Sequence, residues 1–246
     1  MRIDKEACIA CGLCEPYCPM GAISVRETAE IDRDECVECG VCFRSSICQT
    51  GAIQKEELKW PRSVAGLFSD PTSAHPSTGI LGRGTEEMKT NEVTGRLKKG
   101  WAGVAVELGR PHAGTRFRDV AKVARTVASV AGVVFEPQNP VTHLMTDVRT
   151  GEIREDILDV KAMSAIVELA VPEEHLLEVL DAIARVAPDL ETVFSLDVAA
   201  KCDHGGTSPL EPIIRASGFR SLPNGKTNVG LGRPRYNGPE GELTLG

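Results

Sequence analysis

Long apolar runs are missing from this sequence. Nowhere do eighteen apolar residues follow one another, and residues 1–6, Met-Arg-Ile-Asp-Lys-Glu, lack the apolar core of a secretory signal. We therefore expect a cytoplasmic protein that does not span a membrane. An excess of basic residues is missing as well, because 28 Lys and Arg stand against 35 Asp and Glu, for a formal net charge of -7. General binding to nucleic acid is therefore not expected.

Cysteine, by contrast, is abundant. Eight of the nine cysteines fall between Cys8 and Cys48, a density that indicates disulfides, zinc or iron-sulfur clusters. The missing export signal disfavours disulfides. Structural zinc usually takes its ligands as separated pairs, which disfavours zinc. The first run is Cys8-x2-Cys11-x2-Cys14-x3-Cys18-Pro19, the bacterial iron-sulfur spacing in which three thiolates bind one cluster and the fourth binds another.

A second run, Cys36-x2-Cys39-x2-Cys42-x5-Cys48, repeats the first. The repeat extends beyond the cysteines, since Ile3-Asp4 maps onto Ile31-Asp32 and Gly21-Ala22-Ile23 onto Gly51-Ala52-Ile53. Two half-domains are the simplest explanation.

Residues 1–57 resemble the bacterial-type ferredoxin family, a small pseudo-symmetric fold with two [4Fe-4S] clusters. The resemblance implies that each half gives its last cysteine to the other half's cluster. The implied ligands are Cys8, Cys11, Cys14 and Cys48 for one cluster, and Cys36, Cys39, Cys42 and Cys18 for the other. The sequence departs from the family pattern at Gln49, where the family has proline, and at residues 43–47, which lengthen the last spacing. We therefore expect two unequal reduction potentials.

Two roles remain open for this segment. So short a segment buries little apolar surface, so the clusters could act only as structural staples. Two adjacent clusters also make a relay, which favours electron transfer. Residues 1–57 hold six Lys or Arg and eleven Asp or Glu. That acidic charge predicts a redox partner protein with a basic docking face.

Residues 58–101 read as an irregular linker packed on the surface of its neighbours. Proline and glycine interrupt every candidate element, whereas Trp60, Val64 and Phe68 supply apolar anchors. Residues 85–91 could start a short helix or line a site.

Residues 102–246 read as an α+β domain with a Gly- and Pro-rich tail. Strands are predicted at 102–108, 133–136, 164–171 and 192–199, with helices at 117–131 and from 172 onward, and residues 141–148 look extended. This order is that of a βαββαβ split sandwich, an antiparallel sheet with both helices on one face. Such a fold has no function of its own.

Candidate catalytic groups lie in loops after the strands. If these loops converge, Arg110, Lys201 and Arg233 could hold a small carboxylate substrate, and His112 or His204 could pass protons. The alternative is that they are solvated loop charges. The ninth cysteine, Cys202, is more typical of a small core residue than of a reactive thiol.

A second resemblance covers much of residues 58–235. Residues 82–96, Gly-Arg-Gly-Thr-Glu-Glu-Met-Lys-Thr-Asn-Glu-Val-Thr-Gly-Arg, together with residues 107–111, Glu-Leu-Gly-Arg-Pro, resemble ferredoxin-containing 6-hydroxynicotinate reductase proteins. This resemblance implies an oxidoreductase that reduces an N-heteroaromatic acid, and it assigns no catalytic residue.

Three functions therefore compete. An iron-sulfur oxidoreductase component would pass electrons to a substrate or partner site at the second domain. A plain electron carrier would use that domain only to dock a partner or to dimerise, and a sensor would regulate another protein. No Gly-x-Gly-x-x-Gly follows a predicted strand and no phosphate loop is visible, so a nucleotide or flavin site is not indicated.

Overall fold

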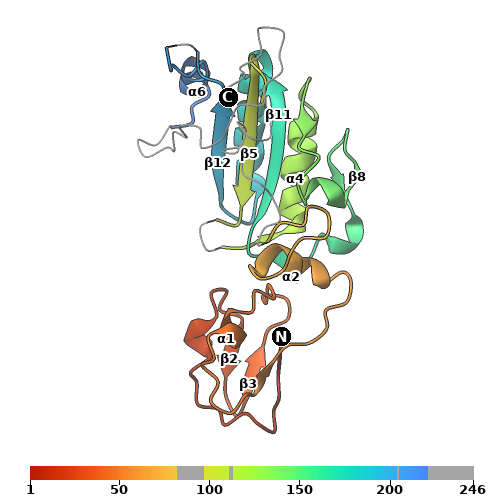
Figure 1. Ribbon diagram of the computed structural model, residues 1–246, viewed down its shortest axis with the longest axis vertical. Coiled ribbons are helices and arrows are strands. Elements are labelled where there is room, and N and C mark those ends of the chain that lie inside the picture. The colour runs from red at the N-terminus through yellow and green to blue at the C-terminus, as the bar shows by residue number, and fades with distance from the viewer. Residues whose placement is uncertain (82–96, 111–112, 204, 221–246) are drawn as a thin grey trace, which may run out of the picture.

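The computed structural model describes residues 1–81, 97–110, 113–203 and 205–220. The N-terminal residues form one small body and the later residues a larger one, with helix α2 (Ser63–Ser69) between them (Figure 1). Helices and strands are both present, which confirms the α+β class.

Two small antiparallel sheets build the N-terminal body, and each takes one strand from either copy of the repeat. Strand β1 (Arg2–Ile3) pairs with β4 (Ile53–Gln54), and β2 (Ile23–Val25) pairs with β3 (Ala29–Ile31). Ile3 lies opposite Ile53 and Ile31 lies opposite Ile23, so the repeat maps one pair onto the other. The two halves are therefore interleaved.

The core of the N-terminal body is small. The 3-10 helix η1 (Glu15–Tyr17) and the short helix α1 (Val41–Arg44) are its only helical elements among the described residues. One cluster of buried hydrophobic residues forms it, namely Met1, Cys14, Ile23, Ala29, Cys42 and Ile53. Two of these six are cysteines, so apolar burial alone contributes little, and metal binding is the usual source of folding free energy for such a body.

Helix α2 differs from the irregular surface path that the sequence predicts for residues 58–101. Val64 and Phe68 are buried in the core of the larger body. The Phe68 ring packs edge-on against Phe117, with 5.1 Å between ring centroids. The prolines Pro61 and Pro71 flank the helix, and so short a helix between prolines carries little periodic pattern. The domain boundaries 1–57, 58–101 and 102–246 stay a prediction.

One four-stranded antiparallel sheet forms the larger body. Its strands are β5 (Trp101–Leu108), β7 (Val134–Phe135), β11 (Ala165–Pro172) and β12 (Phe194–Ala200), in the order β12-β5-β11-β7. The chain reaches these strands through helices α4 (Phe117–Ala128) and α5 (Leu176–Val186), which pack against each other.

The helices and the sheet share one core. Alternate residues of β5, namely Val104, Val106 and Leu108, are fully buried in it. Helix α4 contributes Phe117, Val120, Val123, Ala124 and Val127, which recur at the three- and four-residue steps of an amphipathic helix. Burial of each such large side chain is worth about 1.5–3 kcal/mol, so this body can fold on apolar packing.

Several predicted boundaries move in the structure. The helix expected to reach residue 131 ends at Ala128, and Pro172 is the last residue of β11 rather than the start of a helix. The 3-10 helix η5 (Glu173–His175) then precedes α5. The expected strands at 133–136, 164–171 and 192–199 each shift by one or two residues. Fraying and short 3-10 turns at element ends explain these differences.

The extended segment predicted for residues 141–148 is wrong over its first half. Residues Thr142–Leu144 form the 3-10 helix η3, and only β8 (Met145–Asp147) is extended, where it pairs with β9 (Glu152–Ile153). The Asn139 side chain accepts a hydrogen bond from the Val141 amide at 2.8 Å, a local turn that competes with a strand.

Smaller elements complete the larger body. They are β6 (Thr115–Arg116), which pairs with β10 (Lys161–Ala162), and the 3-10 helices η4 (Glu155–Ile157) and η6 (Ala187–Asp189). The tail, expected to be irregular, contains α6 (Glu211–Ala216), and the preceding Leu210 is buried in the core. The helix suggested for residues 85–91 lies outside the described residues.

Candidate iron-sulfur sites

Cys8, Cys11, Cys14 and Cys48 line a single cavity, which we call the distal cavity. The cavity has a volume of about 420 Å³, counting the open space at its mouth. Three of the cysteines come from the first run, and Cys48 comes from the second. Apolar side chains, among them Ile3, Val25 and Ile53, form the remainder of the lining.

Backbone amides point at the sulfurs of the distal cavity. The Ala29 amide donates to Cys8 Sγ at 3.3 Å, and the Ala52 amide donates to Cys48 Sγ at 3.2 Å. Thr50 Oγ1 lies 3.6 Å from Cys48 Sγ. Burial raises the pKa of the Cys48 thiol, but the hydrogen bonds of Thr50 and of the backbone outweigh burial, so that the pKa of Cys48 is lowered. These hydrogen bonds favour the thiolate form of Cys48, the cysteine that follows the lengthened last spacing.

Cys18, Cys36, Cys39 and Cys42 line a second cavity, the inner cavity, of about 330 Å³ with its mouth included. Here Cys18 is the cysteine that comes from the other run. The Ala22 amide donates to Cys18 Sγ at 3.2 Å, as the Ala52 amide does to Cys48 in the other half. Each cavity is therefore lined by three cysteines of one run and the last cysteine of the other, and the ligand exchange implied by the ferredoxin resemblance stays a prediction.

The same backbone twist recurs in both cysteine loops. Ala10 and Gly12 have φ of 53° and 77°, and Glu38 and Gly40, which the repeat places opposite them, have φ of 56° and 69°. A left-handed conformation is costly for Ala and Glu. Its presence at both equivalent positions indicates that the cysteine spacing requires it, because the loop must fold tightly enough to bring three sulfurs around one cavity.

The inner cavity is the more buried of the two. Burial raises the pKa of the Cys36 and Cys39 thiols, and it raises the pKa of Cys42 to about 11. Iron deprotonates a coordinating thiol outright, so a cluster assembled here would release protons. Four sulfurs, amide donors and an apolar lining are the donor set and surroundings that suit a [4Fe-4S] cluster. Within the described residues no group of three or more His, Cys, Asp and Glu side chains is arranged to hold a single metal ion, so the cysteines of the two cavities do not form a site for one lone ion.

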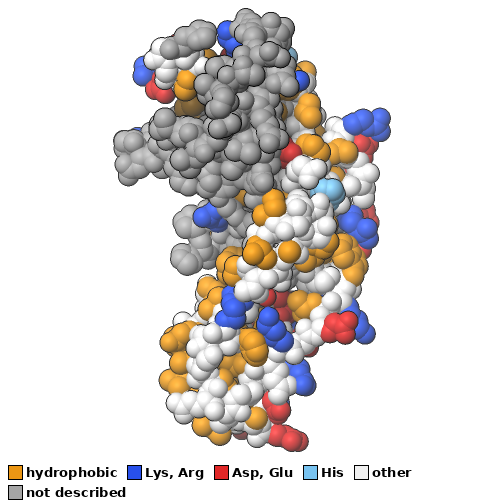
Figure 2. Space-filling view, in the orientation of Figure 1, with side chains coloured by type: hydrophobic (Ala, Val, Ile, Leu, Met, Phe, Trp, Pro, Cys, Tyr) orange, Lys and Arg blue, Asp and Glu red, His pale blue; other side chains and the backbone are white. Residues whose placement is uncertain are grey.

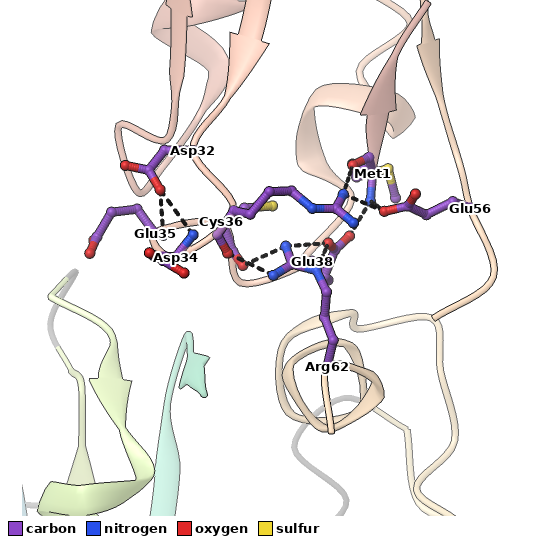
Figure 3. A network of polar contacts seen from close by, with 9 residues as sticks. Met1, Asp32, Asp34, Glu35, Cys36, Glu38, Glu56 and Arg62 are labelled. Atoms are coloured by element: carbon purple, nitrogen blue, oxygen red, sulfur yellow. Dashed lines mark hydrogen bonds and ion pairs between the residues drawn. The ribbon is translucent and has the colours of Figure 1, made fainter. Parts of the chain in front are cut away.

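A network of charges connects the inner cavity to α2 (Figure 3). Glu38, which is 2% exposed, pairs with the amino group of Met1 and accepts a hydrogen bond from Arg62 Nε at 2.8 Å. Arg62 also donates to the carbonyl oxygens of Arg33 at 2.6 Å and of Cys36 at 3.3 Å. The loop that carries Cys36 is thereby held against the start of α2.

A second set of contacts connects the inner cavity to the second domain. Glu35, next to Cys36, pairs with Arg116 at 2.8 Å and also with Lys161. Met20, which lines the inner cavity, lies against Gly114, where an added Cβ would come within 2.7 Å of Met20 Cε. The inner cavity therefore lies beside the second domain.

Arg110 and Lys201, the two predicted catalytic residues that the structure describes, do not come together. Arg110 follows β5 and pairs with Glu107 at 2.8 Å. Lys201 follows β12, and because Ala200 lies opposite Ala102, it is at the other end of the sheet. The condition that these two loops converge is therefore not met, because β5 and β12 are antiparallel neighbours and the loops that follow them lie at opposite ends of the sheet. His112, His204 and Arg233 lie outside the described residues.

The remaining candidate residues have local roles. Cys202 is exposed, which contradicts its interpretation as a small core residue. His175 lies 3.3 Å from Glu178 on α5, and His143 is exposed. Burial lowers the pKa of Lys201.

The charged residues at the domain junction were missed in the sequence. Arg62 contacts Glu38, and Glu35 contacts Arg116 and Lys161. The longest of these separations is 126 residues, between Glu35 and Lys161, and no local pattern marks such pairs.

Comparison with known proteins supports the first cysteine run alone. The 4Fe-4S binding domain family matches residues 1–24, which include Cys8, Cys11, Cys14 and Cys18. No curated protein and no solved structure matches the chain. No helix in the described ranges is long and apolar enough to cross a membrane. The N-terminal segment thus carries a 4Fe-4S binding domain.

Proposed function

We propose that this chain is an iron-sulfur electron-transfer component that holds two [4Fe-4S] clusters, one in each cysteine-lined cavity. The observation that carries the proposal is the lining itself: each cavity has four cysteines, three from one run and one from the other. The assigned ligands are Cys8, Cys11, Cys14 and Cys48 in the distal cavity, and Cys36, Cys39, Cys42 and Cys18 in the inner one.

Bound clusters supply one-electron redox chemistry, and the protein residues tune it. The amides of Ala29 and Ala52 and the Thr50 hydroxyl lie against sulfurs of the distal cavity, and the Ala22 amide against one of the inner cavity. Hydrogen bonds and solvent exposure both raise a reduction potential by stabilising the extra negative charge. The distal site is the more exposed of the two, so it is assigned the higher potential of an unequal pair.

The second domain is proposed to be the place where electrons are used. Its sheet order and its two intervening helices support a βαββαβ split sandwich. The inner cavity lies beside it, at Glu35 and Met20. Reduction of an N-heteroaromatic acid follows from the sequence resemblance, and the plain electron carrier is the alternative. The separation of Arg110 from Lys201 argues against a carboxylate held by both.

Three cysteine variants test the proposal, each purified under anaerobic conditions. Cys14→Ser removes a ligand of the distal cavity, Cys42→Ser removes one of the inner cavity, and Cys202→Ser is the matched control. The first two are expected to bind about half of the wild-type iron and to show the EPR signal of one isolated cluster after reduction. The control is expected to keep all its iron.

Two results would contradict the two-cluster assignment. One is full iron content in Cys14→Ser and Cys42→Ser, which would mean that these cavities do not hold clusters. The other is a loss of iron in Cys202→Ser that matches the loss in the other two variants.

A further inference from the structure

The two cavities differ in what surrounds them. Two residues that line the inner cavity, Met1 and Met20, lie at the junction with α2 and the second domain. In the described part of the chain, no residue that lines the distal cavity has a hydrogen bond or ion pair with residues beyond 57. A partner protein therefore has access to the distal cavity and is kept from much of the inner one.

Apolar side chains are exposed at the distal cavity. Ile9 and Leu13, which line it, are 64% and 40% exposed, and Tyr17 beside them in sequence is 45% exposed. Figure 2 shows apolar side chains grouped on the surface of the N-terminal body. Cys11 is also exposed, so a bound centre would lie close to the surface here. We call Ile9, Leu13 and Tyr17 the distal rim.

Carboxylates flank the distal rim. Glu6 precedes Cys8 by two residues, Glu15 follows Cys14, and Glu27 lies in the turn between β2 and β3. All three are exposed, and none has an ion pair within the described ranges. The nearby Lys5 forms an ion pair with Glu30 at 3.0 Å. Arg26 is then the nearby cation that is left to balance the negative charge of these three carboxylates. An apolar centre with a negative border is the complement of a basic face with an apolar centre.

We propose that the distal rim is the docking surface for a one-electron carrier protein whose contact face bears Lys and Arg around an apolar centre. The proposal rests on the proposed function, because it requires a cluster in the distal cavity. One electron passes between the partner's redox centre and that cluster, so one centre is oxidised as the other is reduced.

The test uses cytochrome c, a small lysine-rich one-electron acceptor, as the probe. The reduced full-length protein is mixed with oxidised cytochrome c, and the second-order rate constant is measured at low and high salt. The variant is Glu6→Lys/Glu15→Lys/Glu27→Lys. The matched control is Glu57→Lys, an exposed carboxylate in the same body that lies next to Leu58, a contact of α2 at Gly66.

The triple variant is expected to lose tenfold or more in rate constant at about 10 mM salt, and the loss is expected to shrink at about 1 M salt. Glu57→Lys is expected to react like wild type. Succinylated cytochrome c, whose lysines carry carboxylates, is expected to react slowly with wild type at low salt. Tyr17→Ser is expected to lower the rate constant at both salt concentrations, because its contribution is apolar.

Each failure has its own signature. If the triple variant binds full iron and keeps the wild-type EPR signals, yet reacts with cytochrome c as fast as wild type, the docking surface is overturned and the two clusters stand. Equal losses in Glu57→Lys and the triple variant overturn it too. If wild type itself shows no cluster signal, the proposed function fails. A small uncharged quinone should reoxidise all variants alike, and slower reoxidation of the triple variant would assign its defect to the cluster.

Discussion

Replacement of Arg62 by methionine should loosen the inner cavity and leave the distal one intact. Arg62 is the residue that ties α2 to the loop of Cys36, through Glu38 and two backbone carbonyls. Methionine keeps much of the aliphatic stem of arginine and removes the guanidinium. The change therefore isolates the charge and its hydrogen bonds.

The expected cost follows from what Arg62 leaves behind. Loss of one partner from a buried ion pair costs about 3–5 kcal/mol, but Glu38 keeps the amino group of Met1, so the pair is only half broken. The carbonyls of Arg33 and Cys36 lose one donor each, at about 0.5–1.5 kcal/mol per hydrogen bond. Arg62 is 26% exposed in its side chain, and water replaces part of the loss. We expect about 2–4 kcal/mol in total.

The assay is unfolding of the anaerobic holoprotein in urea, followed by the visible absorbance of the clusters. Arg26→Met is the control, because Arg26 is exposed and has no ion pair in the described part of the chain, and it should stay within about 0.5 kcal/mol of wild type. EPR at intermediate urea should show the inner cluster of Arg62→Met lost first. Equal unfolding midpoints for the two variants, or earlier loss of the distal cluster, would show that Arg62 does not stabilise the inner cavity.

Two further predictions concern the second domain. Gly151→Ala should destabilise the second domain by about 2 kcal/mol or more, because the new Cβ would lie 2.4 Å from Ala124 O. Gly100→Ala should cost less, because Gly100 is also at positive φ but an added Cβ there would have nothing within 4 Å. Thermal unfolding of both variants checks this, and equal costs would contradict it. Burial lowers the pKa of His75 in the folded protein, and the nearby His143 lowers it further. The unfolded state therefore binds more protons, so the free energy of unfolding should fall as pH drops below about 6.5. His75→Asn should flatten the slope of the free energy of unfolding against pH by up to one proton. An unchanged slope in urea unfolding at several pH values would count against this.

The cysteine sites could be predicted from the sequence because their geometry is local. Three sulfurs at a spacing of three residues must surround one point, and the repeat that relates Ala22 to Ala52 also predicts matched surroundings for Cys18 and Cys48. The exchange of the fourth cysteine came from family resemblance. Only the structure shows the four sulfurs of each set around one cavity.

Other features had no local pattern to reveal them. Helix α2 is short and flanked by prolines, and its burial depends on Phe117, 49 residues after Phe68. The Glu35 contacts with Arg116 and Lys161 depend on the docking of two bodies. The sheet and its helices were predictable because alternation and helical stripes are properties of single segments. Where the loops at the strand ends lie relative to one another depends on which strands are antiparallel neighbours in the sheet, which no single segment reveals.

The presence of two [4Fe-4S] clusters is tested most directly by iron and sulfide analysis of the anaerobically purified wild-type chain, combined with EPR after reduction. With two clusters bound, we expect about eight irons and about eight sulfides per chain, and the broadened EPR signals of two interacting [4Fe-4S] clusters. Zinc in place of iron, or about four irons with one isolated signal, would contradict it.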